Sequence, residues 1–185
     1  MNKTKILILL IFIAAACRDV ANKGAPETDL SYIDTRYHGP NDVKTIIDPL
    51  MKTENITKDG VHKLTYYLYY ENKISDSIKY SLKEDTSYRA KIEVSKNTSY
   101  RITYQRDRTY LLNGNRYKIY KYLVSQGGYD GESSHFWNPN LGIILIRSNT
   151  WNNQYSITSK TDSVNALLQT LNLLILQDDK FLKEN

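Results

Sequence analysis

Cysteine is the rarest residue in this chain, occurring once in 185 residues, as Cys17. No internal disulfide can therefore form, and the fold has to rest on its own core. Histidine is almost as scarce. The three histidines, His38, His62 and His135, all lie more than four positions apart, which excludes the usual ligand spacing of a zinc site. We therefore expect no metal and no cofactor.

Sequence motifs of catalysis are also lacking. There is no Gly-x-Ser-x-Gly nucleophile motif, and the glycines of 127–131 lack the lysine of a phosphate-binding loop. Ser133 or Ser134 can meet His135 only if the fold brings them together, and the acidic pair around Gly131 fits a solvated loop. We expect no enzymatic activity, and a hydrolase is the least favoured alternative.

Long apolar runs are missing as well. The apolar run at the N-terminus, Ile6–Ala16, has eleven residues, whereas a membrane-spanning helix needs about 20. Lys3 and Lys5 precede it. A basic segment followed by a short apolar run is typical of a secretory signal peptide, which we assign to residues 1–16.

The end of this segment carries a family resemblance. Ala14-Ala15-Ala16 directly before Cys17 resembles the lipobox of bacterial lipoproteins, although Ala14 stands where leucine is usual. The resemblance implies cleavage before Cys17, which then becomes the first residue of the mature protein and carries the fatty-acyl (palmitate-type) membrane anchor. Acylation also accounts for an unpaired cysteine in an exported chain. Ordinary signal cleavage after Ala16 is the alternative.

Two further features bear on the location of the protein. Arg18 follows Cys17, so the aspartate that retains enteric lipoproteins in the inner membrane is absent. This favours the outer membrane, on its periplasmic or surface face. The segment 136–142, Phe-Trp-Asn-Pro-Asn-Leu-Gly, looks like a turn of uncharacterised envelope lipoproteins of Bacteroidota, a resemblance that implies no known activity.

The charge balance argues against a nucleic-acid partner. The net charge of +5 falls to +3 once residues 1–16 are removed, because Lys3 and Lys5 leave and no acidic residue does. A nucleic-acid protein would show a clustered basic face. The 16 tyrosines against three phenylalanines favour strands whose rings are buried and whose hydroxyls stay wet.

Residues 17–58 are assigned to the lipidated cysteine, a tether and a short helix. Residues 18–40 are polar and show no periodicity, as expected of a tether. Within 41–52 the apolar residues Val43, Ile46, Ile47 and Leu50 have helical spacing. Since Pro49 interrupts a helix interior, we expect this helix to end near Asp48.

Residues 59–185 are assigned to a single β domain with a C-terminal helix. From residue 61 apolar and polar residues alternate, which predicts strands. Asn113-Gly114 is a strong hairpin signal. From about 161–163 the period changes to that of an amphipathic helix of roughly 14–18 residues. The predicted strands are 62–70, 77–83, 88–95, 100–105, 110–112, 116–124, 132–137, 142–148 and 153–158.

Short strands separated by turns predict a mainly β fold. We expect a curved antiparallel meander or open barrel of about eight strands, closed by the C-terminal helix. This order of elements is similar to that of lipocalin-like barrels, which implies a ligand inside the sheet. Fold alone does not give function.

The segment from Tyr129 to Trp151 holds both tryptophans and several amides. We select Tyr129, His135, Trp137 and Trp151 as candidate ligand-binding residues. The favoured function is a non-enzymatic, membrane-anchored binding module. It would bind an apolar ligand inside the sheet under the helix, or a glycan on an aromatic face around Trp137 and Trp151. The alternative is a protein-interaction lipoprotein, such as an inhibitor, immunity protein or assembly factor.

Overall fold

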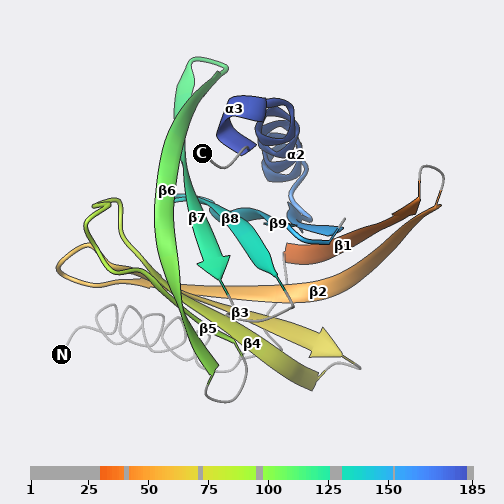
Figure 1. The fold of residues 1–185 in the computed structure, drawn as a ribbon, viewed down its shortest axis with the longest axis horizontal. Helices are drawn as coiled ribbons and strands as arrows, with labels where there is room; N and C mark the ends of the chain where they lie inside the picture. The colour runs from red at the N-terminus through yellow and green to blue at the C-terminus, as the bar shows by residue number, and fades with distance from the viewer. Residues whose placement is uncertain are drawn as a thin grey trace, which may run out of the picture.

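The computed structural model describes residues 30–39, 42–70, 73–94, 98–125, 131–151 and 153–182. They form a ten-stranded antiparallel barrel with two helices after the last strand (Figure 1). Each strand pairs with its neighbours in sequence, and β1 also pairs with β10, which closes the barrel. The strands are β1 Leu30–Gly39, β2 Asp42–Ile56, β3 His62–Tyr70, β4 Lys73–Leu82, β5 Lys91–Val94, β6 Thr98–Leu112, β7 Asn115–Ser125, β8 Glu132–Asn138, β9 Gly142–Ser148 and β10 Asn153–Ser159.

The predicted antiparallel β class is confirmed, but the prediction for residues 30–56 was wrong. Instead of a tether and a short helix, they form β1 and β2, the long ribbon drawn in red to orange in Figure 1. Apolar residues at helical spacing in 43–50 misled the prediction. Several of them are β-branched and Pro49 opposes a helix, while β1, β3 and β10 offer backbone partners. These two strands raise the count from about eight to ten.

The hairpin between β6 and β7 forms where it was predicted. Asn113 has φ +50° and Gly114 has φ +79°, as a tight turn with two left-handed residues requires. The two predicted strands 100–105 and 110–112 are parts of one continuous strand, β6. Its register against β7 shifts between Tyr104 and Arg106, which is the mark of a β-bulge. This hairpin rises beyond the barrel, beside the helices (Figure 1).

A second bulge explains why the run 142–146 is apolar throughout. Phe136 pairs with Leu145 and Trp137 pairs with Ile143, so Ile144 is the extra residue in β9. Ile143 and Ile146 belong to or pack against the core inside the barrel, while Ile144 and Leu145 belong to a second core outside it. This strand is therefore covered on both faces.

The helix α2, Asp162–Gln177, has 16 residues, which confirms its predicted length. It begins after Thr161, whose side chain makes no capping hydrogen bond. Its buried residues Leu168, Leu171 and Ile175 pack on the outer face of the barrel against Phe136 and its neighbours. Each such side chain contributes roughly 1.5–3 kcal/mol. The predicted C-terminal helix is thus present and covers the outside of the barrel, while the pairing of β1 with β10 closes the barrel itself.

A short helix, α3 (Asp179–Leu182), follows α2 and was not predicted. Cations of the outer barrel face hold its end. Lys121 Nζ donates to the carbonyl oxygen of Leu182 at 2.7 Å, and an Arg106 guanidinium nitrogen donates to that of Lys180 at 2.7 Å. Positive charge at a helix C-terminus is stabilising because the last carbonyls carry partial negative charge. The ring of Phe181 belongs to the core under the helices, and its centroid lies 5.5 Å from the centroid of the Phe136 ring.

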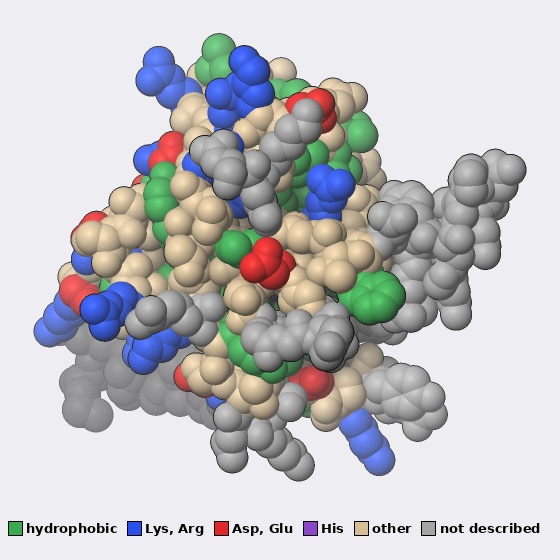
Figure 2. Space-filling view, in the orientation of Figure 1, with side chains coloured by type: hydrophobic (Ala, Val, Ile, Leu, Met, Phe, Trp, Pro, Cys, Tyr) green, Lys and Arg blue, Asp and Glu red, His purple; other side chains and the backbone are tan. Residues whose placement is uncertain are grey.

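Figure 2 shows one face of the molecule, where hydrophobic side chains surface between polar ones and charges of both signs are interspersed.

The interior of the barrel is a core separate from the one under the helices. The buried core residues inside the barrel are Leu50, Leu64, Tyr66, Tyr80, Leu82, Ala90, Ile92, Ile102, Tyr120, Tyr122, Val124, Trp137, Ile143 and Ile157.

Candidate functional site: a cavity at one end of the barrel

A cavity of about 260 Å3 lies inside the barrel, between the ends of β4, β5 and β7 and the strands β8 to β10. Its volume is close to the lower end of small-molecule pockets, roughly 300–1,000 Å3. Aliphatic, aromatic and polar side chains all line it. The lining residues are Ile78, Tyr80, Ile92, Val94, Val124, Gly131, Glu132, Ser133, His135, Ile146, Ser148, Trp151, Asn153 and Tyr155.

Strand β8 places the polar groups of the cavity. Side chains alternate between the two faces of a strand, so Ser133, His135 and Trp137 lie on one face, which packs inside the barrel. Ser134 lies on the other face, where its hydroxyl donates to Asn149 Oδ1 at 3.0 Å. Phe136 belongs to the core under the helices.

A chain of three hydrogen-bonding groups lines one wall of the cavity. The Tyr80 hydroxyl lies 2.9 Å from His135 Nδ1, and Ser133 Oγ lies 2.9 Å from His135 Nε2. Tyr80 is 2% and His135 5% exposed, whereas Ser133 is half-buried. Both ring nitrogens of His135 are therefore engaged, and the serine is the member of the chain that reaches the open cavity.

Burial keeps the His135 ring neutral. Desolvation lowers the pKa of His135 from 6.5 to about 3, because a low-dielectric surrounding disfavours the charged imidazolium. A general base works best when its pKa is near the operating pH. The Ser133–His135 pair has the separation of a nucleophile and its base, but Tyr80, not a carboxylate, occupies the third position. The arrangement is better suited to hydrogen bonding than to nucleophilic catalysis.

Trp151 lies at the rim of the cavity and is 59% exposed. The turn before it is fixed by Ser148, whose Oγ accepts hydrogen bonds from the backbone N–H of Trp151 at 2.8 Å and of Thr150 at 3.3 Å. Gly131 stands opposite with φ +85°, and a Cβ atom there would collide with the Thr150 side chain. The backbone at Gly131 therefore packs closely against the Thr150 side chain at the rim.

Trp137 lies at the other end of the barrel interior and is fully buried. Its ring meets that of His62 edge-on at 5.1 Å and that of Tyr120 at 5.2 Å. Its Nε1 has no hydrogen-bond partner among the residues that the structure describes. Trp137 plugs the barrel, so it does not form an outer aromatic face with Trp151.

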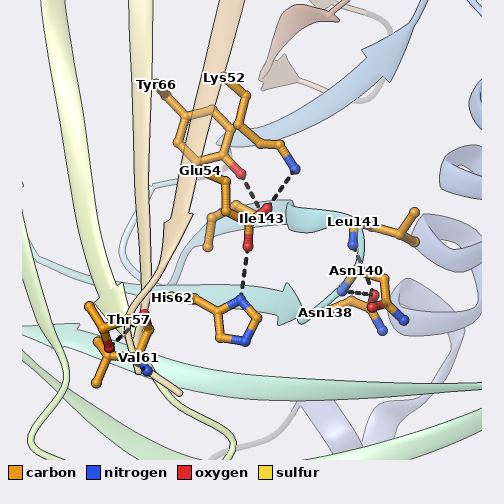
Figure 3. A network of polar contacts seen from close by, with 10 residues as sticks. All are labelled: Lys52, Glu54, Thr57, Val61, His62, Tyr66, Asn138, Asn140, Leu141 and Ile143. Carbon is orange, nitrogen blue, oxygen red and sulfur yellow. Dashed lines mark hydrogen bonds and ion pairs between the residues drawn. The ribbon is translucent and has the colours of Figure 1, made fainter. Parts of the chain in front are cut away.

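Polar contacts close the barrel around this plug (Figure 3). His62 Nδ1 lies 2.8 Å from Glu54 Oε1, and Lys52 Nζ lies 3.3 Å from Glu54 Oε2. The Tyr66 hydroxyl accepts a hydrogen bond from the Ile143 N–H at 2.7 Å, and burial raises the pKa of Tyr66. These groups satisfy one another at this end of the barrel.

The amides near Trp137 are engaged in structure. Asn138 Oδ1 accepts from the backbone N–H groups of Asn140 and Leu141, each at 3.0 Å (Figure 3). Its Nδ2 donates to the Lys118 carbonyl at 3.0 Å. This side chain therefore holds the turn between β8 and β9, which was predicted. It is not available to bind a sugar hydroxyl.

Of the four candidate ligand-binding residues, His135 and Trp151 line the same cavity. Trp137 lies in the core, and Tyr129 falls outside the described residues, as does Cys17. The aliphatic walls and Tyr80 were missed as site residues. The alternation Ile78–Tyr80 and Ile92–Val94 marked them as inward-facing, but periodicity cannot say which inward positions are packed and which border a cavity.

Comparisons with known protein families, with characterised proteins and with solved structures give no match for this chain. Among the described residues, no helix is both long and apolar enough to cross a membrane. Within the same residues no group of three or more His, Cys, Asp or Glu side chains is placed to hold a metal ion.

Proposed function

We propose that this chain is the precursor of a lipid-anchored envelope lipoprotein whose barrel binds a small apolar ligand. The observation that carries the binding proposal is the cavity of about 260 Å3. Its walls combine apolar side chains with polar groups from β4 and β8 to β10, and apolar walls with some placed polar groups are the usual make-up of a small-molecule site. The lining residues come from six different strands, so the closed barrel itself shapes the cavity.

The anchor proposal rests on the sequence. Lys3 and Lys5, the apolar run 6–16 and the small residues before Cys17 favour a lipoprotein signal. The barrel begins at Leu30, 13 residues after Cys17. A fully extended chain spans about 3.5 Å per residue, which limits the distance from the anchor to roughly 45 Å. The barrel would thus stay close to the membrane. Because Arg18, and not aspartate, follows Cys17, the outer membrane is favoured.

The anchor is tested by mass spectrometry of the mature N-terminus and by phase partition in detergent. We expect the native chain to begin at Cys17, to carry acyl chains and to partition into detergent. The variant Cys17→Ala should carry no lipid and remain in the aqueous phase. A native N-terminus at Cys17 without acyl mass would instead support ordinary cleavage after Ala16.

The ligand is tested by organic extraction of the protein purified from its host, followed by mass spectrometry of the extract. The variant Val94→Trp places a large side chain at the half-buried rim position. The matched control Leu111→Trp changes a side chain on β6 that is 69% exposed and does not line the cavity. A compound present with the native chain and with Leu111→Trp, but lost with Val94→Trp, supports the proposal. An empty native protein that also binds no added apolar compound contradicts it.

The structure gives less support to the two alternative functions, a glycan site and a protein-interaction surface. A glycan site retains Trp151 but not Trp137, since the latter is buried. For a protein-interaction surface, the large apolar side chains that are exposed lie on β2, β4, β6, the turn before β10 and α2: Ile47, Ile56, Ile74, Leu111, Trp151 and Leu173. Such scattered residues are common on protein surfaces and do not by themselves mark an interface.

A further inference from the structure

The chemistry of the cavity wall restricts the kind of ligand that fits. Among the described residues that line the cavity, Glu132 is the one acidic residue, and it stands at the start of β8, at the rim. His135 is neutral because burial lowers its pKa to about 3. No lysine or arginine is among the described lining residues. A ligand anion buried against these walls would lose its hydration without gaining a cationic partner, and a ligand cation beside Ser133 and His135 would meet neutral groups, because Glu132 lies at the rim.

The hydrogen-bonding chain, in contrast, can serve a neutral polar group of either kind. If the Tyr80 hydroxyl donates to His135 Nδ1, then Nε2–H donates to Ser133 Oγ, and the serine hydroxyl is left to donate to a ligand carbonyl. If Ser133 donates to Nε2 instead, the lone pairs of Ser133 Oγ accept from a ligand hydroxyl. A shift of the imidazole tautomer thus lets Ser133 act as donor or acceptor without any net charge.

Isoleucine and tyrosine side chains of the wall continue deeper into the barrel. Ile78, Tyr80, Ile146 and Tyr155 border both this cavity and a small apolar hollow of about 20 Å3 that Leu50 also lines. With roughly 30 Å3 for each water-sized group, the main cavity of about 260 Å3 holds a ligand of about nine non-hydrogen atoms.

We infer that the ligand is an uncharged amphiphile of this size, with a hydroxyl or carbonyl group bonded to Ser133 and a hydrocarbon part against Ile78, Ile92 and Ile146. The inference rests on the proposed ligand-binding function and names its ligand class. It excludes fatty carboxylates, which the absence of a cation from the described walls disfavours. It also excludes alkylammonium ions, whose one acidic partner among the described lining residues, Glu132, lies at the rim and not beside Ser133 and His135.

The test uses the full chain carrying Cys17→Ser, so that no detergent needed for a lipid anchor competes for the cavity. Three probes of one chain length, n-octanol, octanoate and octylammonium, are titrated at about pH 7.5, where the two ions are charged. Fluorescence reports binding, because Trp151 lies exposed at the rim while Trp137 is buried elsewhere in the barrel. The variant Trp151→Phe, which should lose the signal, identifies the reporter.

We expect n-octanol to bind at least tenfold more tightly than octanoate or octylammonium. Ser133→Ala should weaken n-octanol binding about three- to tenfold, as loss of one hydrogen bond does. The matched control Ser134→Ala changes the next residue of β8, which faces out of the barrel and bonds to Asn149, and should leave the affinity unchanged. Urea midpoints measured in parallel show that both variants are folded.

The outcomes separate the two proposals. If octanoate or octylammonium binds as tightly as n-octanol, the neutral-ligand inference is overturned while the proposed binding function stands. If Ser133→Ala and Ser134→Ala have the same effect on a well-bound n-octanol, the placement of the polar group at Ser133 is overturned. If none of the three probes binds, the proposed ligand-binding function fails, and the inference fails with it.

Discussion

The buried His135 gives a quantitative prediction about stability and pH. Its pKa is lowered to about 3 in the folded protein, whereas the imidazole of an unfolded chain titrates near 6.5. Between these two values the unfolded state binds a proton that the folded state does not. Acidification in this window therefore favours unfolding, and the stability that neutral His135 supports is fully present only above about pH 6.5.

The size of the effect follows from proton linkage. Lowering the pH from about 7.5 to about 5 should reduce the free energy of unfolding by about 2 kcal/mol through His135 alone, since each pH unit well inside the window contributes about 1.4 kcal/mol. The lowered pKa values of the exposed Asp59 and Asp85 act at more acidic pH. The window above about pH 5 thus isolates histidine.

The measurement is urea unfolding at several pH values for the native chain, His135→Gln and His62→Gln. His135→Gln should be less stable at pH 7.5, because Tyr80 and Ser133 lose their shared partner, but its stability should depend less on pH by about 2 kcal/mol across the window. His62→Gln controls for the histidine beside Glu54. If the native chain and His135→Gln lose stability equally on acidification, His135 is not buried as the structure places it.

Three further substitutions test the packing. Gly142→Ala should lower the free energy of unfolding by about 1–3 kcal/mol because its φ is +86°. The loss should be larger still because the new Cβ would lie 2.5 Å from the Tyr66 hydroxyl. A urea midpoint within error of the native chain would contradict this. Phe181→Ala should lower the free energy of unfolding by about 3–5 kcal/mol and speed proteolysis at the C-terminus. Leu111→Ala changes a side chain that is 69% exposed and should change the free energy of unfolding by no more than about 0.5 kcal/mol. Asn138→Ala removes the partner of two N–H groups and one carbonyl. It should lower the free energy of unfolding by about 1–3 kcal/mol, and the thermal midpoint by roughly 2–4 °C for each 1 kcal/mol in a domain of this size.

Local sequence patterns were sufficient for much of the fold. Alternating residues in 62–70 located β3, the continuous apolar run 142–146 located β9, and Asn113-Gly114 placed a hairpin whose two residues do adopt positive φ. The helix after Thr161 has the predicted length. In each case the signal is contained in a few neighbouring residues, because turn geometry and side-chain periodicity are local properties.

The N-terminal strands show where local patterns end. Residues 43–50 satisfy a helical spacing, and only pairing with β1 and β3 makes them a strand. β1 itself has β10, more than a hundred residues away in sequence, as its second partner. Hydrogen bonds between distant segments leave no trace in either segment alone, so the closure of the barrel and its tenth strand could not be predicted.

For the site, the sequence by itself determined the residue types: a tyrosine-rich sheet, both tryptophans and one histidine in 129–151, and inward-facing aliphatic positions at every second residue. Only the tertiary structure decided their roles. Trp137 and His135 lie two residues apart on one face of β8, yet one plugs the core and the other borders a cavity. The difference depends on which side chains of the other strands fill the space opposite each, and packing across a closed barrel is a property of all ten strands together.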